Sequence, residues 1–134
     1  MPDYILSLVE QVGLLLRELA RARRAEKPAL LSAIFLRETG LPLEVVKHSA
    51  PETILQLLES GGGTQHMRAI ILAELLLQDA AINEAAGKLR DAIIARAQAR
   101  ALIAHSIDQL SSEDQDIYRS KLEELNVDLK RGDP

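Results

Sequence analysis

The sequence "AIILAELLLQDAAINEAAGKLRDAI", residues 69–93, decides the fold. Large apolar side chains occupy almost every side of the helix predicted over its first part: Ile70, Ile71, Leu72, Leu75, Leu76 and Leu77, continued by Ala80 and Ala81. A helix that is apolar nearly all round is buried among other helices. The stretch therefore predicts a central helix that follows a cap at Thr64 and runs to about Ala85.

Gly87 interrupts this pattern, and a second helix is predicted from about Lys88 to Asp108. Its many alanines would let a neighbouring helix approach closely. We expect its apolar side to contain Leu89, Ile93, Ile103 and Ile107. Two long helices joined by a tight turn form an antiparallel hairpin. A second hairpin of this kind is expected around Glu26 and Lys27.

Local signals mark the first two helices. The N-terminal helix is predicted from Asp3, a good N-cap residue, to about Arg23. The next helix is predicted from Pro28, a favoured first-turn residue, to about Glu38. Gly40 then ends it as a C-terminal cap.

Three further helices complete the expected chain. Short helices are predicted in "LPLEVVKHS", residues 41–49, and in "APETILQLLES", residues 50–60. The last helix begins in "SSEDQ", residues 111–115, where Ser112 and Gln115 have the spacing of a capping box.

The residue choice supports an all-α fold. The chain has 18 alanines but only five valines and three aromatic residues, and strands favour β-branched and aromatic side chains. We predict a single helical domain over residues 1–130, with a frayed tail at 131–134. Its arrangement is expected to be antiparallel helical hairpins, with about six or seven helices, two of them short, and a C-terminal capping helix.

The segment "NEAAGKLRDAI", residues 83–93, looks like the turn inside a tetratricopeptide-type helix pair, so the expected helical hairpins are tetratricopeptide-like. The two expected turns, however, lie 61 positions apart, from Glu26 to Gly87. Tetratricopeptide repeats have a period of about 34 residues. The segments "YILSLVEQVGLLL" (4–16), "LLESGGG" (57–63) and "AELLLQDAAINEAAGK" (73–88) together resemble an uncharacterised bacterial family of short helical proteins, a domain of unknown function. The resemblance covers Tyr4 to Ile107. It implies a bacterial origin and a helical-hairpin fold, and it supplies no catalytic residues.

Bulk properties exclude several classes of protein. The net charge of −4 lacks the strongly basic balance of many nucleic-acid-binding domains, and the absence of cysteine excludes disulfides and thiolate chemistry. The N-terminal sequence lacks a basic region and is interrupted by Glu10, so it does not resemble a signal peptide. We expect a cytoplasmic protein with no membrane partner.

The glycines Gly61, Gly62 and Gly63 raise the question of a phosphate-binding loop. Such a loop needs a preceding strand and a following Gly-Lys-Ser/Thr, and both are missing here. We interpret the glycines as a joint between helices. A weak anion site at the helix that follows Thr64 remains the alternative.

The other polar candidates form no convincing catalytic or metal constellation. Glu44 and His48 lie one helical turn apart, but a metal needs more ligands, and His66 or His105 would have to supply them. Ser106 and His105 are adjacent on a helix and therefore diverge, which disfavours a triad with Asp108. The three carboxylates spaced by five residues are expected to spread around their helix: Glu74, Asp79 and Glu84.

Two features favour a partner-binding role. The densest charge feature is the basic run Arg17, Arg21, Arg23, Arg24 and Lys27, in which Arg17, Arg21 and Arg24 share one face. The last helix carries an apolar stripe formed by Tyr118, Leu122, Leu125 and Leu129. This stripe either caps the domain internally or packs on another subunit, and the sequence leaves both open.

We therefore predict a non-catalytic interaction or scaffold protein whose partner is another protein or a second copy of the chain, as in a homodimer. We expect no cofactor, no bound metal and no small-molecule substrate. The alternatives are a helical bundle that binds a metal or small ligand, and a weak nucleic-acid binder that uses the Arg17–Lys27 run.

Overall fold

The computed structural model describes residues 7–59 and 65–132 of the chain. Within these ranges the chain forms seven α-helices and one short 3-10 helix, and it contains no strand. The helices are α1 (Leu8–Ala20), α2 (Lys27–Thr39), α3 (Leu43–Lys47), α4 (Pro51–Glu59), α5 (Gln65–Ala85), α6 (Leu89–Ser106), the 3-10 helix η1 (Ile107–Gln109) and α7 (Ser112–Gly132). The all-α class predicted from the residue choice is confirmed.

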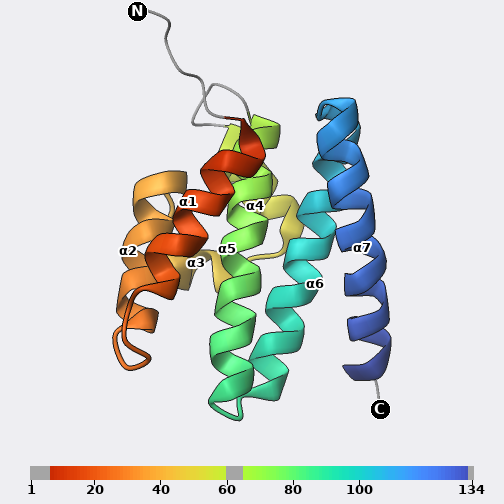
Figure 1. Cartoon of the computed structure of the whole chain (residues 1–134). Helices are drawn as coiled ribbons and strands as arrows, with labels where there is room; N and C mark the ends of the chain where they lie inside the picture. The colour runs from red at the N-terminus through yellow and green to blue at the C-terminus, as the bar shows by residue number, and fades with distance from the viewer. Residues whose placement is uncertain (1–6, 60–64, 133–134) are drawn as a thin grey trace, which may run out of the picture.

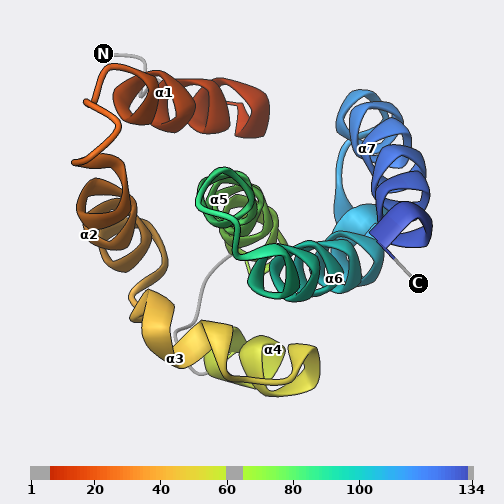
Figure 2. The same cartoon turned by 90° about the horizontal axis from the view of Figure 1, so that it is seen from below.

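The helices are arranged around α5. Viewed along the helices, α5 lies at the centre, with α1 on one side of it and α3 and α4 on the other (Figure 2). α1, α2, α4 and α6 all pack against α5, and α7 packs on α6 at the far edge (Figure 1). None of the described helices is both long enough and apolar enough to cross a bilayer.

The burial of α5 confirms its predicted central position. Seven of its residues are at most 1% exposed: Ala69, Ile70, Leu72, Ala73, Leu75, Leu76 and Ala80. Full burial of a leucine or isoleucine stabilises a fold by about 1.5–3 kcal/mol. α5 is therefore the element on which the hydrophobic core is built.

The first hairpin, α1–α2, is set by local capping. Ser7 is the N-cap of α1, and it forms a capping box in which its Oγ accepts from Glu10 N (3.2 Å) while Glu10 Oε1 accepts from Ser7. The helix begins here, whereas the predicted cap, Asp3, lies outside the described residues. At the other end of the hairpin, Pro28 stands in the first turn of α2 and Gly40 caps its last turn with φ 75°, both as predicted.

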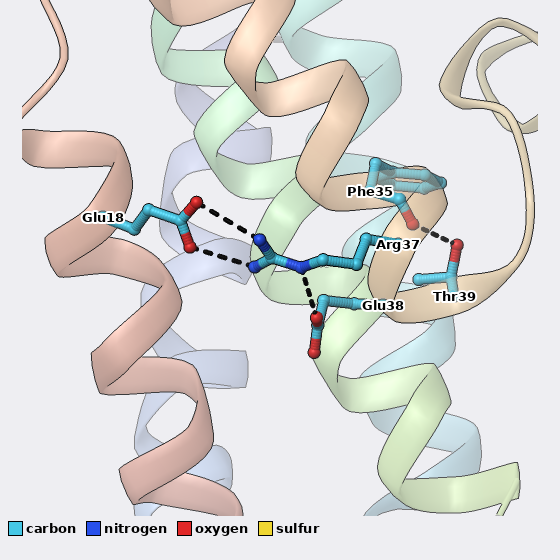
Figure 3. A network of polar contacts seen from close by, with 5 residues as sticks. All are labelled: Glu18, Phe35, Arg37, Glu38 and Thr39. Carbon is cyan, nitrogen blue, oxygen red and sulfur yellow. Dashed lines mark hydrogen bonds and ion pairs between the residues drawn. The ribbon is translucent and has the colours of Figure 1, made fainter.

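A charged contact ties α1 to α2 (Figure 3). Arg37 Nη2 and Nη1 donate to the two carboxylate oxygens of Glu18 at 2.9 and 3.3 Å, and Arg37 Nε donates to Glu38 Oε2 at 2.8 Å. The hydrogen bond from Arg37 holds the pKa of Glu18 below its usual value. Nearby, Thr39 Oγ1 donates to the carbonyl oxygen of Phe35 at 2.7 Å and so secures the end of α2.

The second hairpin, α5–α6, turns at Gly87, whose φ of 80° is strained for residues with a side chain. Its buried α6 face differs from the predicted one. Leu89 is 61% exposed, whereas Ala92, Ala95 and Ala99 are at most 2% exposed. The small alanine side chains let α6 lie close to α5, and this approach buries the alanine face and leaves Leu89 outside. Of the predicted side, only Ile103 is fully buried.

The N-cap residue of the last helix, α7, is one position earlier in the sequence than predicted. The Oγ of Ser111, rather than Ser112, accepts from Asp114 N at 3.3 Å. Gln115 donates instead to the carbonyls of Asp108 (3.3 Å) and Leu110 (3.0 Å), which end the preceding segment. α7 continues to Gly132, so part of the predicted tail is helical, and residues 133–134 lie outside the described ranges.

We expect Leu76→Asp to unfold the domain, because Leu76 is 0% exposed at the centre of α5 and the new carboxylate has no partner there. The expected loss exceeds about 4 kcal/mol of unfolding free energy, which is a large part of the stability of a typical domain. Urea denaturation followed by circular dichroism measures the loss. Ala81→Asp is the matched control, because Ala81 is exposed on the same helix and its replacement should cost less than about 1 kcal/mol. Equal midpoints for the two variants would contradict the central placement of α5.

Candidate functional site

An apolar groove of about 550 Å³ lies between the end of α1, the start of α2 and the second half of α5. Its walls are mainly apolar or small residues: Leu16, Leu19, Ala20, Pro28, Ala81, Ile82, Ala85 and Ala86, with Gln78. Arg24 and Lys27 also line it. These apolar and small residues are called the apolar floor of the groove. The groove therefore combines an apolar floor with two cations, a combination suited to an amphipathic ligand.

The groove incorporates part of the predicted basic run. Arg24 lines it directly. Because α1 ends at Ala20, Arg24 lies in the turn before α2, so the predicted helical face shared by Arg17, Arg21 and Arg24 does not extend to it. Arg17 and Arg21 are exposed. Within the described chain, none of the five cations between residues 17 and 27 takes part in an ion pair. This contrasts with the paired cations Arg37, Lys47, Arg96, Arg119 and Lys121.

The sequence identified the cations but not the apolar wall of the groove. That wall unites residues of α1 and α5 that are about 60 positions apart, and no local pattern brings them together. The spacing of Leu16 and Ala20, one helical turn apart at the end of α1, is the one signal that could have marked the α1 side.

The predicted stripe on α7 faces the rest of the chain. Tyr118 and Leu125 are 2% and 4% exposed and belong to the main core, and Leu122 is half-buried against it. Leu129 is half-buried and lines a shallow surface pocket with Arg100, Asn126 and Lys130. This side of α7 therefore packs within the chain, while Ile117 and Val127 are about half exposed on the helix.

The three carboxylates of α5 reach three different helices, as their spacing predicts. Glu74 accepts from Lys121 Nζ of α7 at 2.6 Å, and Asp79 pairs with Lys47 Nζ of α3 at 3.5 Å. Glu84 pairs with Arg96 of α6. Because Glu74 and Asp79 are 6% and 5% exposed, their partners compensate charges that would otherwise be unpaired in the interior.

The histidines do not converge. His48 and Glu44 are 3.9 Å apart but both are highly exposed, and His105 and Asp108 are exposed on α6 and η1. In the described ranges, no group of three or more His, Asp or Glu side chains could hold a metal ion. The glycines at 61–63 and Thr64 lie outside those ranges, so the question of an anion site at this position stays a prediction.

Comparisons with known proteins identify no relative: no family model matches the chain, and neither a curated protein nor a solved structure matches it.

We expect Tyr118→Phe to make the protein more resistant to alkali. Burial, the charges of Glu74 and Asp114, and a hydrogen bond to Glu74 raise the pKa of Tyr118 above its usual value of about 10. The unfolded chain therefore releases the phenolic proton first, and the stability of the wild type falls as pH rises past about 10.

The phenylalanine variant lacks this loss, so the difference in stability between the two proteins should move in favour of the variant above about pH 10. At pH 7 the two should differ by less than about 1 kcal/mol, because the lost hydrogen bond to Glu74 is long, at 3.4 Å. Urea midpoints measured at both pH values test this. A pH-independent difference would show that Tyr118 is not buried as described.

Asp79→Asn should alter the pH dependence of stability at acidic pH. Burial raises the pKa of Asp79, and the nearby Lys47 and Asn83 counteract this only in part. The folded state thus holds the proton more tightly than the unfolded chain, so the contribution of Asp79 is most favourable at low pH. It falls as pH rises from about 4 through the raised pKa. The stability of the wild type relative to the variant should therefore increase on acidification. The reverse trend in urea midpoints would contradict the burial of this carboxylate.

Proposed function

We propose that this protein is a non-catalytic interaction protein that binds an acidic, amphipathic segment of a partner protein in the α1–α2–α5 groove. The apolar floor takes the apolar side chains of that segment. Arg24 and Lys27 meet its carboxylates within the groove, and Arg17 and Arg21 extend the positive surface along α1. The partner is either a different protein or a second copy of the chain.

One observation carries this proposal: an apolar groove lined by cations that have no carboxylate partner within the described chain. The chain as a whole has a net charge of −4. The local excess of positive charge is therefore not a consequence of composition. Electrostatic complementarity of this kind favours an acidic partner and accelerates its association.

The groove favours a protein partner over a nucleic acid. Binding of single-stranded nucleic acid relies on exposed aromatic side chains that stack on the bases. Phe35 and Tyr118, the two aromatic residues in the described ranges, are 0% and 2% exposed. A phosphate backbone also makes no use of an apolar floor.

The helical-hairpin arrangement belongs to the same proposal. We infer that the pairs α1–α2 and α5–α6 are tetratricopeptide-like hairpins, which commonly present grooves to extended or helical partner segments. Support comes from their antiparallel course, from the tight turn of residues 86–88 between α5 and α6, and from the longer loop of residues 21–26 between α1 and α2 (Figure 1). The resemblance to the uncharacterised bacterial family stays a prediction.

Selection from an unbiased library of displayed peptides tests the proposed function. The wild-type protein should enrich peptides in which Asp or Glu flank apolar residues at helical spacing. The variant Arg24→Glu with Lys27→Glu should bind these peptides at least about 10-fold more weakly and should prefer basic ones. Neither substitution removes an ion pair, and a carboxylate at Lys27, the first residue of α2, suits the helix dipole.

The matched control is Lys88→Glu with Arg90→Glu, which makes the same change in net charge at the exposed start of α6, outside the groove, and likewise removes no ion pair within the described chain. It should leave the selected peptides and their affinities unchanged. Failure of the wild type to enrich any class of peptide, or equal weakening by both double variants, would overturn the proposal. Light scattering of the protein alone then distinguishes a second copy, which gives a stable oligomer, from a different partner, which leaves a monomer.

A further inference from the structure

The outward side of α7 carries a stripe of carboxylates and apolar side chains. Its members recur at steps of four and three residues and therefore share one side of the helix. This acidic stripe consists of Glu113, Ile117, Ser120, Glu124 and Val127. All five side chains are exposed, including those of Ile117 (47%) and Val127 (49%), whereas Tyr118 and Leu125 on the inward side are buried. The core therefore uses one side of α7 and leaves an amphipathic side open.

The acidic stripe complements the α1–α2–α5 groove in charge. Within the described chain, neither Glu113 nor Glu124 takes part in an ion pair, and the same holds for Arg24 and Lys27 in the groove. Each surface also presents apolar side chains. The stripe thus has the composition that we propose for a groove ligand, with carboxylates beside apolar residues at helical spacing.

The two surfaces also agree in length. The wall that α5 contributes to the groove extends from Gln78 to Ala86, a rise of about 12 Å along the helix. On α7, Ile117 and Val127 are separated by a rise of about 15 Å. A helix lying along the groove can therefore place these two apolar side chains near the two ends of the apolar floor.

α1 and α6 also carry two large exposed apolar side chains each, but they fit the groove less well. Val9 and Leu14 belong to α1, which itself forms one wall of the groove. On α6, the most exposed apolar residue, Leu89, stands between Lys88 and Arg90, and the cations of the groove repel these two. α7 is therefore the helix of this chain that matches the groove in both charge and apolar side chains.

The stripe and the groove of one molecule cannot meet. Tyr118 and Leu125 belong to the main core and hold α7 on α6. In the end-on view, α7 lies at the opposite edge of the domain from α2, whose first residues line the groove (Figure 2). The stripe of one molecule can therefore enter only the groove of another.

We propose that the acidic stripe of one copy of this chain docks in the groove of a second copy, so that copies associate head to tail. Glu113 and Glu124 meet Arg24 and Lys27, while Ile117 and Val127 lie on the apolar floor. This inference rests on the proposed function and names a second copy as the partner. Because two different surfaces meet, each added copy brings a further groove and a further stripe, and assembly continues until a ring closes.

Light scattering of the full chain over a range of concentrations tests the association. The mean molar mass should exceed that of a monomer and rise with concentration. It should fall at about 0.5 M salt, because salt screens the exposed charges of the contact. A monomeric mass at every concentration up to about 500 µM would overturn the proposal.

An exchange of charges between the two surfaces tests which surfaces meet. The groove variant is Arg24→Glu with Lys27→Glu, and the stripe variant is Glu113→Lys with Glu124→Lys. Each variant alone has like charges on both surfaces and should stay monomeric. An equimolar mixture should assemble, because it contains an unaltered groove and an unaltered stripe on different molecules. Assembly of either variant alone to the wild-type extent, or a mixture that stays monomeric, would overturn the proposal.

Matched controls lie outside both surfaces. Glu52→Lys with Asp91→Lys makes the same change in net charge as the stripe variant, at exposed positions on α4 and α6, and should assemble like the wild type. Ile117→Ser should weaken association about fivefold, whereas Leu89→Ser, at a more exposed apolar position, should not change it. Thermal denaturation followed by circular dichroism shows that each variant is folded. Equal weakening by a variant and its control would contradict the docking of the stripe.

The peptide selection separates this inference from the proposed function. Enrichment of acidic peptides by a protein that stays monomeric would retain the proposed function and overturn the second copy as partner. Assembly that persists in the groove variant would likewise overturn the docking of the stripe in the groove. The selection would then decide independently whether the groove binds acidic segments of other proteins.

Discussion

The rest of the structure depends on the need of α5 for neighbours on nearly every side. Its 21 residues span about 31 Å, whereas α1 and α2, with 13 residues each, span about 20 Å. The short helices therefore cover α5 only over part of its length. Where α1 ends and the chain turns back into α2, the second half of α5 continues past them, and the groove lies at that place. The difference in helix length thus explains why the groove exists at this end of the domain.

A helix that is apolar on all sides does not by itself specify how its neighbours are rotated about it. Leucine packs about equally well against several faces, and cores tolerate repacking when volume and pattern are kept. The carboxylates of α5 remove this ambiguity. Glu74 requires Lys121 of α7, and Asp79 requires Lys47 of α3, because an unpaired buried charge is strongly unfavourable. We infer that these two pairs select one arrangement of α3 and α7 among those that the apolar surface permits.

The sequence predicted what local chemistry determines. Residue choice indicated an all-α fold, Pro28 and Gly40 marked the ends of α2, and the apolar stretch from Ile70 to Leu77, broken only by Glu74, indicated a buried helix. The sequence-based prediction was wrong where packing between distant segments determines which side chains are buried or which residue caps a helix. Ranking side chains by hydrophobicity placed Leu89 inside, but close approach to α5 favours the alanines. Adjacent serines at 111 and 112 are equivalent as caps until the tertiary position of Gln115 is known.

The groove and the buried contact made by Gln98 also combine a local pattern with long-range packing. The unpaired cations of residues 17–27 were evident as a charge pattern, but the apolar floor beneath them combines α1 with α5 and has no local signature. Gln98 is a polar residue on the buried alanine face of α6, between Ala95 and Ala99. A single glutamine among alanines looks like an ordinary solvent-facing helix residue until the buried face is known. Its role, to donate hydrogen bonds to the carbonyls of Val46 and Ser49, follows only from the packing of α6 against the end of α3.

The groove and the buried ion pair of Asp79 both draw on the second half of α5, after the apolar stretch ends at Leu77. Gln78, Ala81 and Ile82 contribute to the groove, while Asp79 pairs with Lys47 of α3. Consecutive residues on a helix point about 100° apart, so neighbours in sequence can serve surfaces on different sides of the same helix. Residues 69–76 of α5 cannot do this, because every one of their side chains is buried. Stability and the proposed binding are therefore divided along one helix, and substitutions at Gln78 or Ala81 can change the groove without emptying the core.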